Sequence, residues 1–301
     1  IIKNSYFLDN QTSISGGGIY FVGDNLSQDT LSSCLIRGNI ADQKGGGLFF
    51  DNGIESAIIN CLIVENIITN EVGSGSNGGA GIHHQGNETS YLINTTIANN
   101  TVNGINGRGG GIFAIDNNRF NLINSIIWHN HAPSIPNYNG SDESVDLTSN
   151  IDGLESTFNT DPLFVDMYNG DYRLSDYSPS IGTGTLEGAP SQDLDGNERP
   201  LPIGSNPDMG AYENELGERL MGATYYVSIT GSDSSNGQLA TPYRTIQHGI
   251  NASWAGDTVI VYPGTYQEDI DYQGKNIVLA SRILETEDEA YVDSTIIEGM
   301  V

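Results

Sequence analysis

Cys61-Leu62-Ile63-Val64-Glu65-Asn66 is a short apolar strand that begins with a small residue and ends in asparagine, and a loop then leads to Gly79-Ala80-Gly81-Ile82. This pattern occurs four times in the first 112 residues. The strands are Ser5–Asn10, Cys34–Asn39, Cys61–Asn66 and Thr95–Asn100, and the glycine clusters are Gly16–Ile19, Gly45–Leu48, Gly79–Ile82 and Gly109–Ile112. A fifth strand, Ser125–Asn130, lacks the cluster. A repeat of roughly 30 residues with strand chemistry predicts a solenoid, because one coil cannot bury its own apolar face.

The residues at the repeat boundaries predict corners of a parallel β-helix over residues 1–130. We expect the terminal asparagines to form a ladder, because asparagine tolerates left-handed backbone geometry and its amide can bond to the next coil. These residues are Asn10, Asn39, Asn66, Asn100 and Asn130. The glycine clusters predict another corner, where a positive φ or a close backbone approach excludes a Cβ atom.

Cys34 and Cys61 occupy the same position in consecutive coils, so they should lie about 4.8 Å apart. Two interpretations remain open. The cysteines belong to a ladder of small residues with Ser5, Thr95 and Ser125, or they form a disulfide, because that separation is within the range that a disulfide allows.

Residues 131–216 break the repeat and carry the motifs Asp161–Asp166, Gly170–Leu174, Ser178–Gly184, Asp193–Pro200 and Asp208–Glu213. They resemble the closing segment of secreted right-handed parallel β-helices of the pectin-lyase-like class. The glycine repeats are similar to those of polymorphic outer-membrane proteins. The resemblance implies an all-β, right-handed parallel β-helix and an extracellular or cell-surface location in a prokaryote.

Residues 217–301 resemble the start of such a β-helix, through Tyr225–Ser228, Gly231–Asp233, Thr241–Gln247, Ala255–Val261 and Pro263–Tyr266. Thr241 can cap a helix with Pro242 at its first position. Ile246, Ile250 and Trp254 would then share one face, and Gly256 would end the helix. The spacing predicts a short amphipathic capping helix near residues 242–255.

The chain therefore reads as coils (1–130), a closing segment (131–216), and then a cap with first coils (217–301). This order indicates a window from a tandem array, a circular permutation, or a subunit completed by its neighbour. The first and third explanations imply end-to-end contact with copies of the same chain. The residues expected at those open coil edges are Ile1, Ile2, Ile296, Ile297 and Val301.

The charge balance restricts the partners. With 38 acidic against 11 basic residues, the net charge of −27 argues against binding nucleic acid or an anionic membrane. No apolar run reaches the ~18 residues of a membrane-spanning helix. Acidic loops can hold calcium, and the residues Asp193, Asp195, Asn197 and Glu198 resemble part of a calcium loop, although an ordinary Asp-Gly turn has the same pattern.

Catalysis is not indicated by any residue cluster. A polysaccharide lyase needs a base beside acidic calcium ligands, and a glycoside hydrolase needs facing carboxylates. Neither arrangement stands out in the coils, so we expect a non-catalytic structural or adhesive protein of a filament or tandem surface array. The alternative is a polysaccharide-binding or polysaccharide-cleaving β-helix. In that case Phe49, Phe50 and Phe113 would stack on sugars, although an inward-facing core stack is the expected arrangement of these rings.

Overall fold

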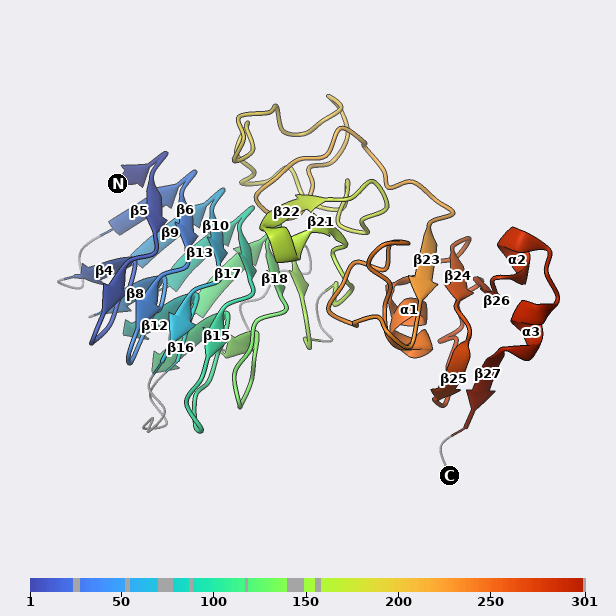
Figure 1. Cartoon of the computed structure of the whole chain (residues 1–301). Coiled ribbons are helices and arrows are strands. Elements are labelled where there is room, and N and C mark those ends of the chain that lie inside the picture. Colours follow the sequence, from blue (N-terminus) through green and yellow to red (C-terminus); the bar gives the residue numbers. More distant parts are fainter. Residues whose placement is uncertain are drawn as a thin grey trace. The chain divides into compact units, whose positions relative to one another are not determined.

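A computed structural model describes residues 1–23, 28–51, 55–69, 78–86, 89–116, 119–139, 149–154 and 158–299. The chain divides into two compact units. Unit 1 comprises residues 1–162 and 180–218, and unit 2 comprises residues 163–179 and 219–301. Each unit is built on parallel β coils, which confirms the all-β parallel β-helix, and the architecture matches the right-handed form (Figure 1).

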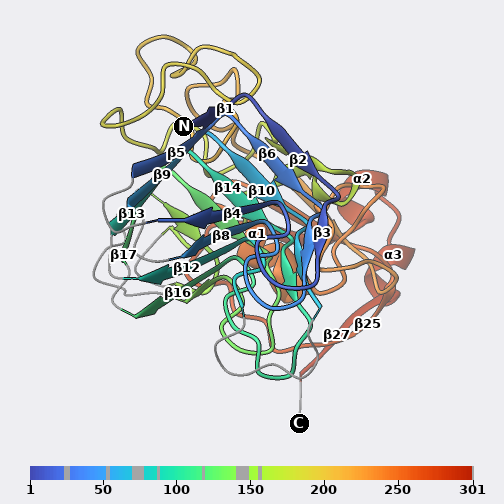
Figure 2. The same ribbon diagram turned by 90° about the vertical axis from the view of Figure 1, so that its left-hand side faces the viewer.

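Unit 1 stacks its strands into four parallel sheets, one strand from each coil in turn (Figure 2). The first sheet is β1(Ile2–Lys3), β5(Gln28–Ser32), β9(Glu55–Ile59), β13(Thr89–Ile93) and β17(Arg119–Ile123). The second is β2(Tyr6–Leu8), β6(Leu35–Arg37), β10(Leu62–Val64), β14(Thr96–Ala98), β18(Ile126–Trp128) and β20(Asn150–Ile151). The third is β3(Gln11–Thr12), β7(Ile40–Ala41), β11(Ile67–Ile68) and β15(Thr101–Val102). The fourth is β4(Ile19–Val22), β8(Leu48–Asp51), β12(Ile82–Gly86), β16(Ile112–Asp116) and β19(Tyr138–Asn139). We call β1–β4 coil 1, β5–β8 coil 2, β9–β12 coil 3, β13–β16 coil 4 and β17–β19 coil 5.

The core of unit 1 is a set of apolar side chains stacked from coil to coil. Ile36, Ile63, Ile97 and Ile127 occupy successive rungs of the second sheet and are fully buried. Because strand side chains alternate between faces, Leu62 and Val64 point away from this core, yet both are also buried. On this outer face the closing segment is bound to the sheet, where the Ala211 amide donates to Thr96 Oγ1 at 3.0 Å.

The corners are made by residues with left-handed backbone geometry. One corner uses Asn4, Ser33, Asn60, Asn94 and Asn124, the next uses Asp9, Gly38, Glu65, Asn99 and His129, and the third uses Gly16, Gly45, Gly79 and Gly109. The ladder asparagines themselves do not have a positive φ. The residue before each asparagine turns the chain.

Glycine is required where coils approach most closely. A Cβ atom on Gly46 would lie 2.7 Å from the carbonyl oxygen of Ala80 in the next coil, and one on Gly17 would lie 2.2 Å from the carbonyl oxygen of Gly46. No side chain fits at such distances, so the second glycine of three clusters (Gly17, Gly46 and Gly110) serves backbone packing, whereas the remaining cluster has the buried Ala80 at this position.

Residues 180–218 of the closing segment run without a regular strand across the first corner of several coils. Arg199 Nη1 donates to Asn60 Oδ1 at 3.2 Å, Asn94 Nδ2 donates to the Asp208 carbonyl at 2.9 Å, and Asn124 Nδ2 donates to the Thr185 carbonyl at 2.7 Å. The segment thus joins coils 3, 4 and 5 along one side of unit 1.

Unit 2 consists of a hairpin and a capped stack of coils. The hairpin is β21(Phe164–Asp166), η2(Met167–Asn169) and β22(Asp171–Leu174). The coils are β23(Thr224–Val227), α1(Ile246–Ala252), β24(Thr258–Val261), β25(Gly264–Gln267), β26(Val278–Ser281), α2(Ile283–Thr286), α3(Ala290–Asp293) and β27(Thr295–Glu298). Strands β23, β24 and β26 form one parallel sheet, and β25 and β27 form another.

The capping helix is confirmed but is shorter than the predicted residues 242–255. It begins later than Thr241 and ends at Ala252, so Trp254 and Gly256 lie beyond it. Helix α1 has Thr245 as its N-cap, and Ile246 and Ile250 are buried. Asp233 accepts hydrogen bonds from the amides of Arg244 and Thr245, both at 2.8 Å, which turns the chain immediately before the helix.

Candidate functional site

The asparagine ladder is a continuous chain of amide hydrogen bonds along unit 1. Each Oδ1 accepts from the backbone amide and from the Nδ2 of the asparagine in the preceding coil. The Nδ2-to-Oδ1 distances are 2.9 Å from Asn10 to Asn39, 2.9 Å from Asn39 to Asn66, 2.9 Å from Asn66 to Asn100 and 2.8 Å from Asn100 to Asn130. Asn39, Asn66 and Asn100 are fully buried, whereas Asn10 at the edge of coil 1 is exposed.

Two further rungs of this ladder were missed by sequence reasoning. Asn130 Nδ2 donates to Asn137 Oδ1 at 3.0 Å, and Asn137 Nδ2 donates to Asp152 Oδ2 at 2.9 Å. Asn137 follows Asn130 by only seven residues, so the coil-length spacing that revealed the other rungs is absent.

A second ladder follows the small residues. The Cys61 amide donates to Thr95 Oγ1 at 3.3 Å, the Thr95 amide donates to Ser125 Oγ at 3.3 Å, and the Ser125 amide donates to Ser149 Oγ at 3.2 Å. Cys34 and Cys61 lie in this ladder as buried free thiols.

Each unit has one coil edge whose apolar side chains are exposed. In coil 1, Tyr6 is 75% exposed and Val22 is 65% exposed, while Ile1 is exposed and Ile2 is half-buried. In unit 2, Ile296 and Ile297 of β27 are 45% and 46% exposed. Val301 lies outside the described residues.

The aromatic residues after the glycine corners are buried. Phe50 belongs to the core of unit 1, where it stacks between Phe21 and His84. Phe49 and Phe113 lie on the opposite face of the sheet and flank His83 edge-on, at ring-centroid distances of 5.1 and 5.2 Å. Burial lowers the pKa of His83 to about 3. All three phenylalanine rings thus pack against protein, with 4% or less of their surface exposed.

The turn at Asp193 uses its carboxylate for hydrogen bonds. Oδ1 accepts from the Asn197 amide at 2.8 Å, and Oδ2 accepts from Asn197 Nδ2 and from the Glu213 amide, both at 3.0 Å. Asp195, Asn197 and Glu198 are exposed. Within the described ranges, no group of three or more His, Cys, Asp or Glu side chains is arranged to hold a metal ion.

A buried ionic cluster in the closing segment was not expected from the sequence. Arg199 Nε and Glu213 Oε2 lie 2.7 Å apart with both side chains fully buried. Asp208 lies beside them and accepts from the amides of Gly182 and Asn214, both at 2.7 Å. Burial, followed by the charge of Glu213, raises the pKa of Asp208 to about 8. Burial also raises the pKa of Glu213.

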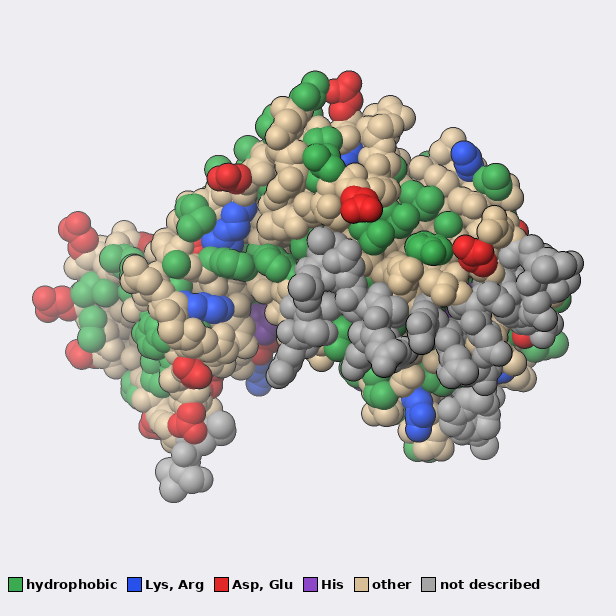
Figure 3. Space-filling model, turned by 180° about the vertical axis from the view of Figure 1, so that it is seen from behind, with side chains coloured by type: hydrophobic (Ala, Val, Ile, Leu, Met, Phe, Trp, Pro, Cys, Tyr) green, Lys and Arg blue, Asp and Glu red, His purple; other side chains and the backbone are tan. Residues whose placement is uncertain are grey.

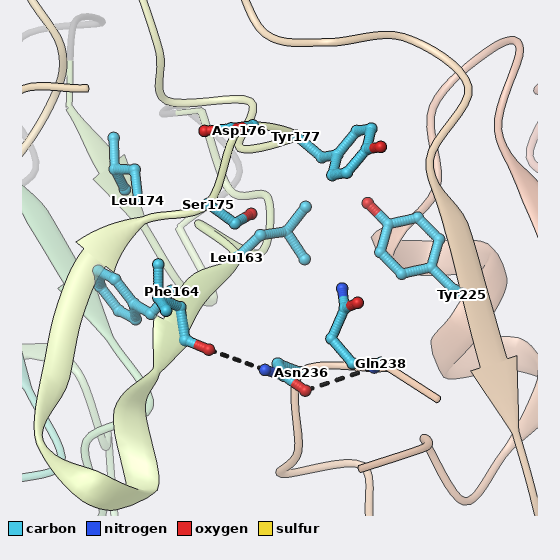
Figure 4. A pocket seen from close by; sticks show the side chains of 10 residues that line it. Leu163, Phe164, Leu174, Ser175, Asp176, Tyr177, Tyr225, Asn236 and Gln238 are labelled. Atoms are coloured by element: carbon cyan, nitrogen blue, oxygen red, sulfur yellow. Dashed lines mark hydrogen bonds between the residues drawn. The ribbon is translucent and has the colours of Figure 1, made fainter. Parts of the chain in front are cut away.

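Unit 2 contains a cavity of about 360 Å³ between the hairpin and the loop before α1 (Figure 4). The wall combines apolar and aromatic side chains with amides and a hydroxyl, and it comprises Leu163, Phe164, Val165, Leu174, Ser175, Asp176, Tyr177, Tyr225, Asn236 and Gln238. The hydroxyls of Tyr177 and Tyr225 approach one another above the Gln238 amide (Figure 4). Asn236 Nδ2 donates to the Val165 carbonyl at 2.8 Å and holds the loop to the hairpin. The lining contains no lysine or arginine and includes the carboxylate of Asp176, so the cavity disfavours an anionic ligand.

The surface carries few basic groups. On the face drawn in Figure 3, the lysine and arginine side chains are scattered rather than gathered into a patch. Among the described residues, no helix has the length and apolar character needed to cross a membrane.

The family match lies in unit 2. Residues 229–274 match a family described as "Protein of unknown function (DUF1565)", which is associated with parallel β-helix proteins. The matched segment contains Asp233, α1, β24 and β25, which are the helical cap and the coil beneath it. The uncharacterized protein YwoF of Bacillus subtilis (strain 168) is 37% identical over 59 residues, which are 20% of this chain and 13% of YwoF. No solved structure matches the chain.

Proposed function

We propose that this protein is a non-catalytic structural or adhesive unit of an extracellular or cell-surface array, in which β-helix coils continue from one copy to the next. The proposal rests on one observation. The chain carries a capped start of a β-helix in unit 2, while coil 1 in unit 1 has an exposed edge. Open sheet edges present unpaired amides and carbonyls that accept another strand.

The edge strand of unit 2 repeats the residue order of a strand in coil 2 of unit 1. Thr295-Ile296-Ile297-Glu298-Gly299 has the same sequence of types as Cys34-Leu35-Ile36-Arg37-Gly38: a small residue, two aliphatic residues, a charged residue and glycine. Ile297 pairs with the buried Tyr266, which places it on the core face of β27. Phe7 pairs with the buried Ile36, which places it on the core face of coil 1.

We therefore infer a specific register for the joint. Ile297 of one copy stacks on Phe7 of the next, and Ile296 lies beside Tyr6 on the outer face. The exposed Asn10 lies at the edge of coil 1, where its Oδ1 would accept from the preceding copy as the Oδ1 atoms of Asn39 and Asn66 accept from the preceding coil.

Cysteine cross-linking tests this register. In a Cys34→Ser, Cys61→Ser background, Tyr6→Cys combined with Ile296→Cys should give a ladder of disulfide-linked multimers, because paired residues on neighbouring strands lie about 4.8 Å apart. Tyr6→Cys combined with Ile297→Cys is the matched control, since those side chains would point to opposite faces. Equal cross-linking of both pairs, or only monomers for both at millimolar concentration, would refute end-to-end addition.

A second candidate function is binding of neutral glycans, which the cavity of unit 2 favours through its two tyrosines and its amide groups. Tyr177→Ala should then abolish binding to a panel of immobilised neutral polysaccharides, while Tyr272→Ala, an exposed tyrosine outside the cavity, should not. Binding that survives Tyr177→Ala would reject the cavity as a glycan site.

A further inference from the structure

Cys34 and Cys61 are held in register in adjacent coils. Leu35 and Leu62, which follow them, are paired, and the Leu62 amide donates to the Cys34 carbonyl at 3.0 Å. Paired residues of neighbouring strands lie about 4.8 Å apart, which is within the Cα separation that a disulfide spans. Both residues are fully buried and both are free thiols.

The two sulfur atoms occupy equivalent places in consecutive coils. Cys34 Sγ donates to the Ser32 carbonyl at 3.3 Å, and Cys61 Sγ donates to the Ile59 carbonyl at 3.3 Å. The thiols also share a hydrogen bond, which lowers the pKa of Cys34 to about 6. Burial raises the pKa of Cys61. Of the two thiols, Cys34 thus ionises more readily and is the nucleophile of the pair.

The hydrogen bonds in the ladder of small residues do not require cysteine at positions 34 and 61. The Cys34 amide uses Cys61 Sγ as its acceptor, whereas deeper rungs use the hydroxyls of Thr95, Ser125 and Ser149. Sulfur is a weak acceptor compared with a hydroxyl oxygen. Serine at both positions would therefore serve the ladder better, and the chemistry that distinguishes cysteine is its reactivity.

Coil 1 controls access to the pair. Cys34 lies directly beneath coil 1, whose own side chains include the largely exposed Tyr6, Ile14 and Val22. Edge elements with little burial open locally at low free energy. Opening of coil 1 exposes Cys34 first, and Cys61 lies one coil deeper.

We propose that Cys34 and Cys61 are a redox-active dithiol that closes to an intercoil disulfide when a low-molecular-weight disulfide reaches the edge of coil 1. Cys34 loses its proton to solvent, and its thiolate attacks one sulfur of oxidised glutathione, so that one glutathione leaves and takes up a proton as the free thiol. Cys61, after losing its proton to solvent, attacks the Cys34 sulfur of the mixed disulfide and releases the second glutathione. The protein loses two electrons and two protons, and one oxidised glutathione becomes two reduced molecules. The bond links coil 2 to coil 3.

The test uses the folded full chain incubated with oxidised glutathione, followed by alkylation of remaining thiols and mass spectrometry. We expect both free thiols to disappear, with no glutathione left on the protein and with a cross-linked peptide that contains Cys34 and Cys61. The oxidised chain should also have a higher thermal midpoint than the reduced chain. Cys61→Ser should stop at a mixed disulfide on Cys34. Cys34→Ser should react at least ~10-fold more slowly, because Cys61 requires a deeper opening.

Two results would overturn the proposal. One is a folded wild-type chain that keeps both thiols while the urea-unfolded chain is oxidised under the same conditions. The other is a wild-type chain that retains glutathione on Cys34, because Cys61 then fails to resolve the mixed disulfide. This test does not depend on assembly, since it is read on a monomer at high dilution.

Discussion

Single side chains in unit 1 carry hydrogen bonds that span coils. Asn66 accepts from the Asn39 amide at 3.0 Å and from Asn39 Nδ2 at 2.9 Å, and it donates to the Ile36 carbonyl at 3.0 Å. An apolar replacement leaves these buried groups without partners. We expect Asn66→Leu to lower the free energy of unfolding by about 2–4 kcal/mol, measured by urea denaturation. Asn10→Leu, at the exposed end of the same ladder, should cost less than about 1 kcal/mol. Equal losses in the two variants would contradict this view of the ladder.

The buried carboxyl of Asp208 predicts that the stability of unit 1 depends on pH. Its pKa is raised from 3.8 to about 8, first by burial, so the folded state keeps a proton that the unfolded state releases. This carboxyl therefore stabilises unit 1 fully below about pH 4, and the contribution is lost as the pH rises through about 8. Its upper limit is about 6 kcal/mol. Urea unfolding at a series of pH values should show this decline, and Asp208→Asn should flatten it. Glu187→Gln, at an exposed position, is the control and should keep the decline in stability. A decline that persists in Asp208→Asn would show that another group causes the pH dependence.

At the scale of elements, helix α1 depends on two carboxylates from outside the helix. Asp233 accepts from the Thr245 amide and from Thr245 Oγ1, and Glu268 accepts from the amides of Ile246 and Gln247, both at 2.9 Å. Together they satisfy amides at the helix start that would otherwise have no partner. Asp233→Ala should destabilise unit 2 by about 1–3 kcal/mol and increase hydrogen exchange in α1. Glu287→Ala, at an exposed residue, should leave that exchange unchanged, and unaltered exchange in Asp233→Ala would count against the capping role.

For the whole molecule, the proposed joint between copies predicts that a charged residue placed on either coil edge weakens self-association. Lysine on an edge strand opposes addition of another strand, because its charge would be buried in the joint. Tyr6→Lys or Ile297→Lys should therefore abolish concentration-dependent multimers in sedimentation velocity, with little change in the thermal midpoint of the monomer. Ile203→Lys, at a largely exposed position in the closing segment, is the matched control. Multimers that persist in both edge variants would place self-association on another surface.

The sequence by itself determined the solenoid, because the repeat of apolar strands, asparagines and glycines is local and recurs in every coil. It also determined that a capping helix precedes the coils of unit 2 and that Asn10, Asn39, Asn66, Asn100 and Asn130 align from coil to coil. Only the tertiary structure decided which residues take the left-handed backbone, since Glu65 and His129 have no obvious preference for it. The same holds for Asn137 and for the cluster of Arg199, Asp208 and Glu213, because their contacts join segments whose spacing in the chain follows no period. Burial of Phe49 and Phe113 likewise depends on neighbouring coils rather than on their own strands.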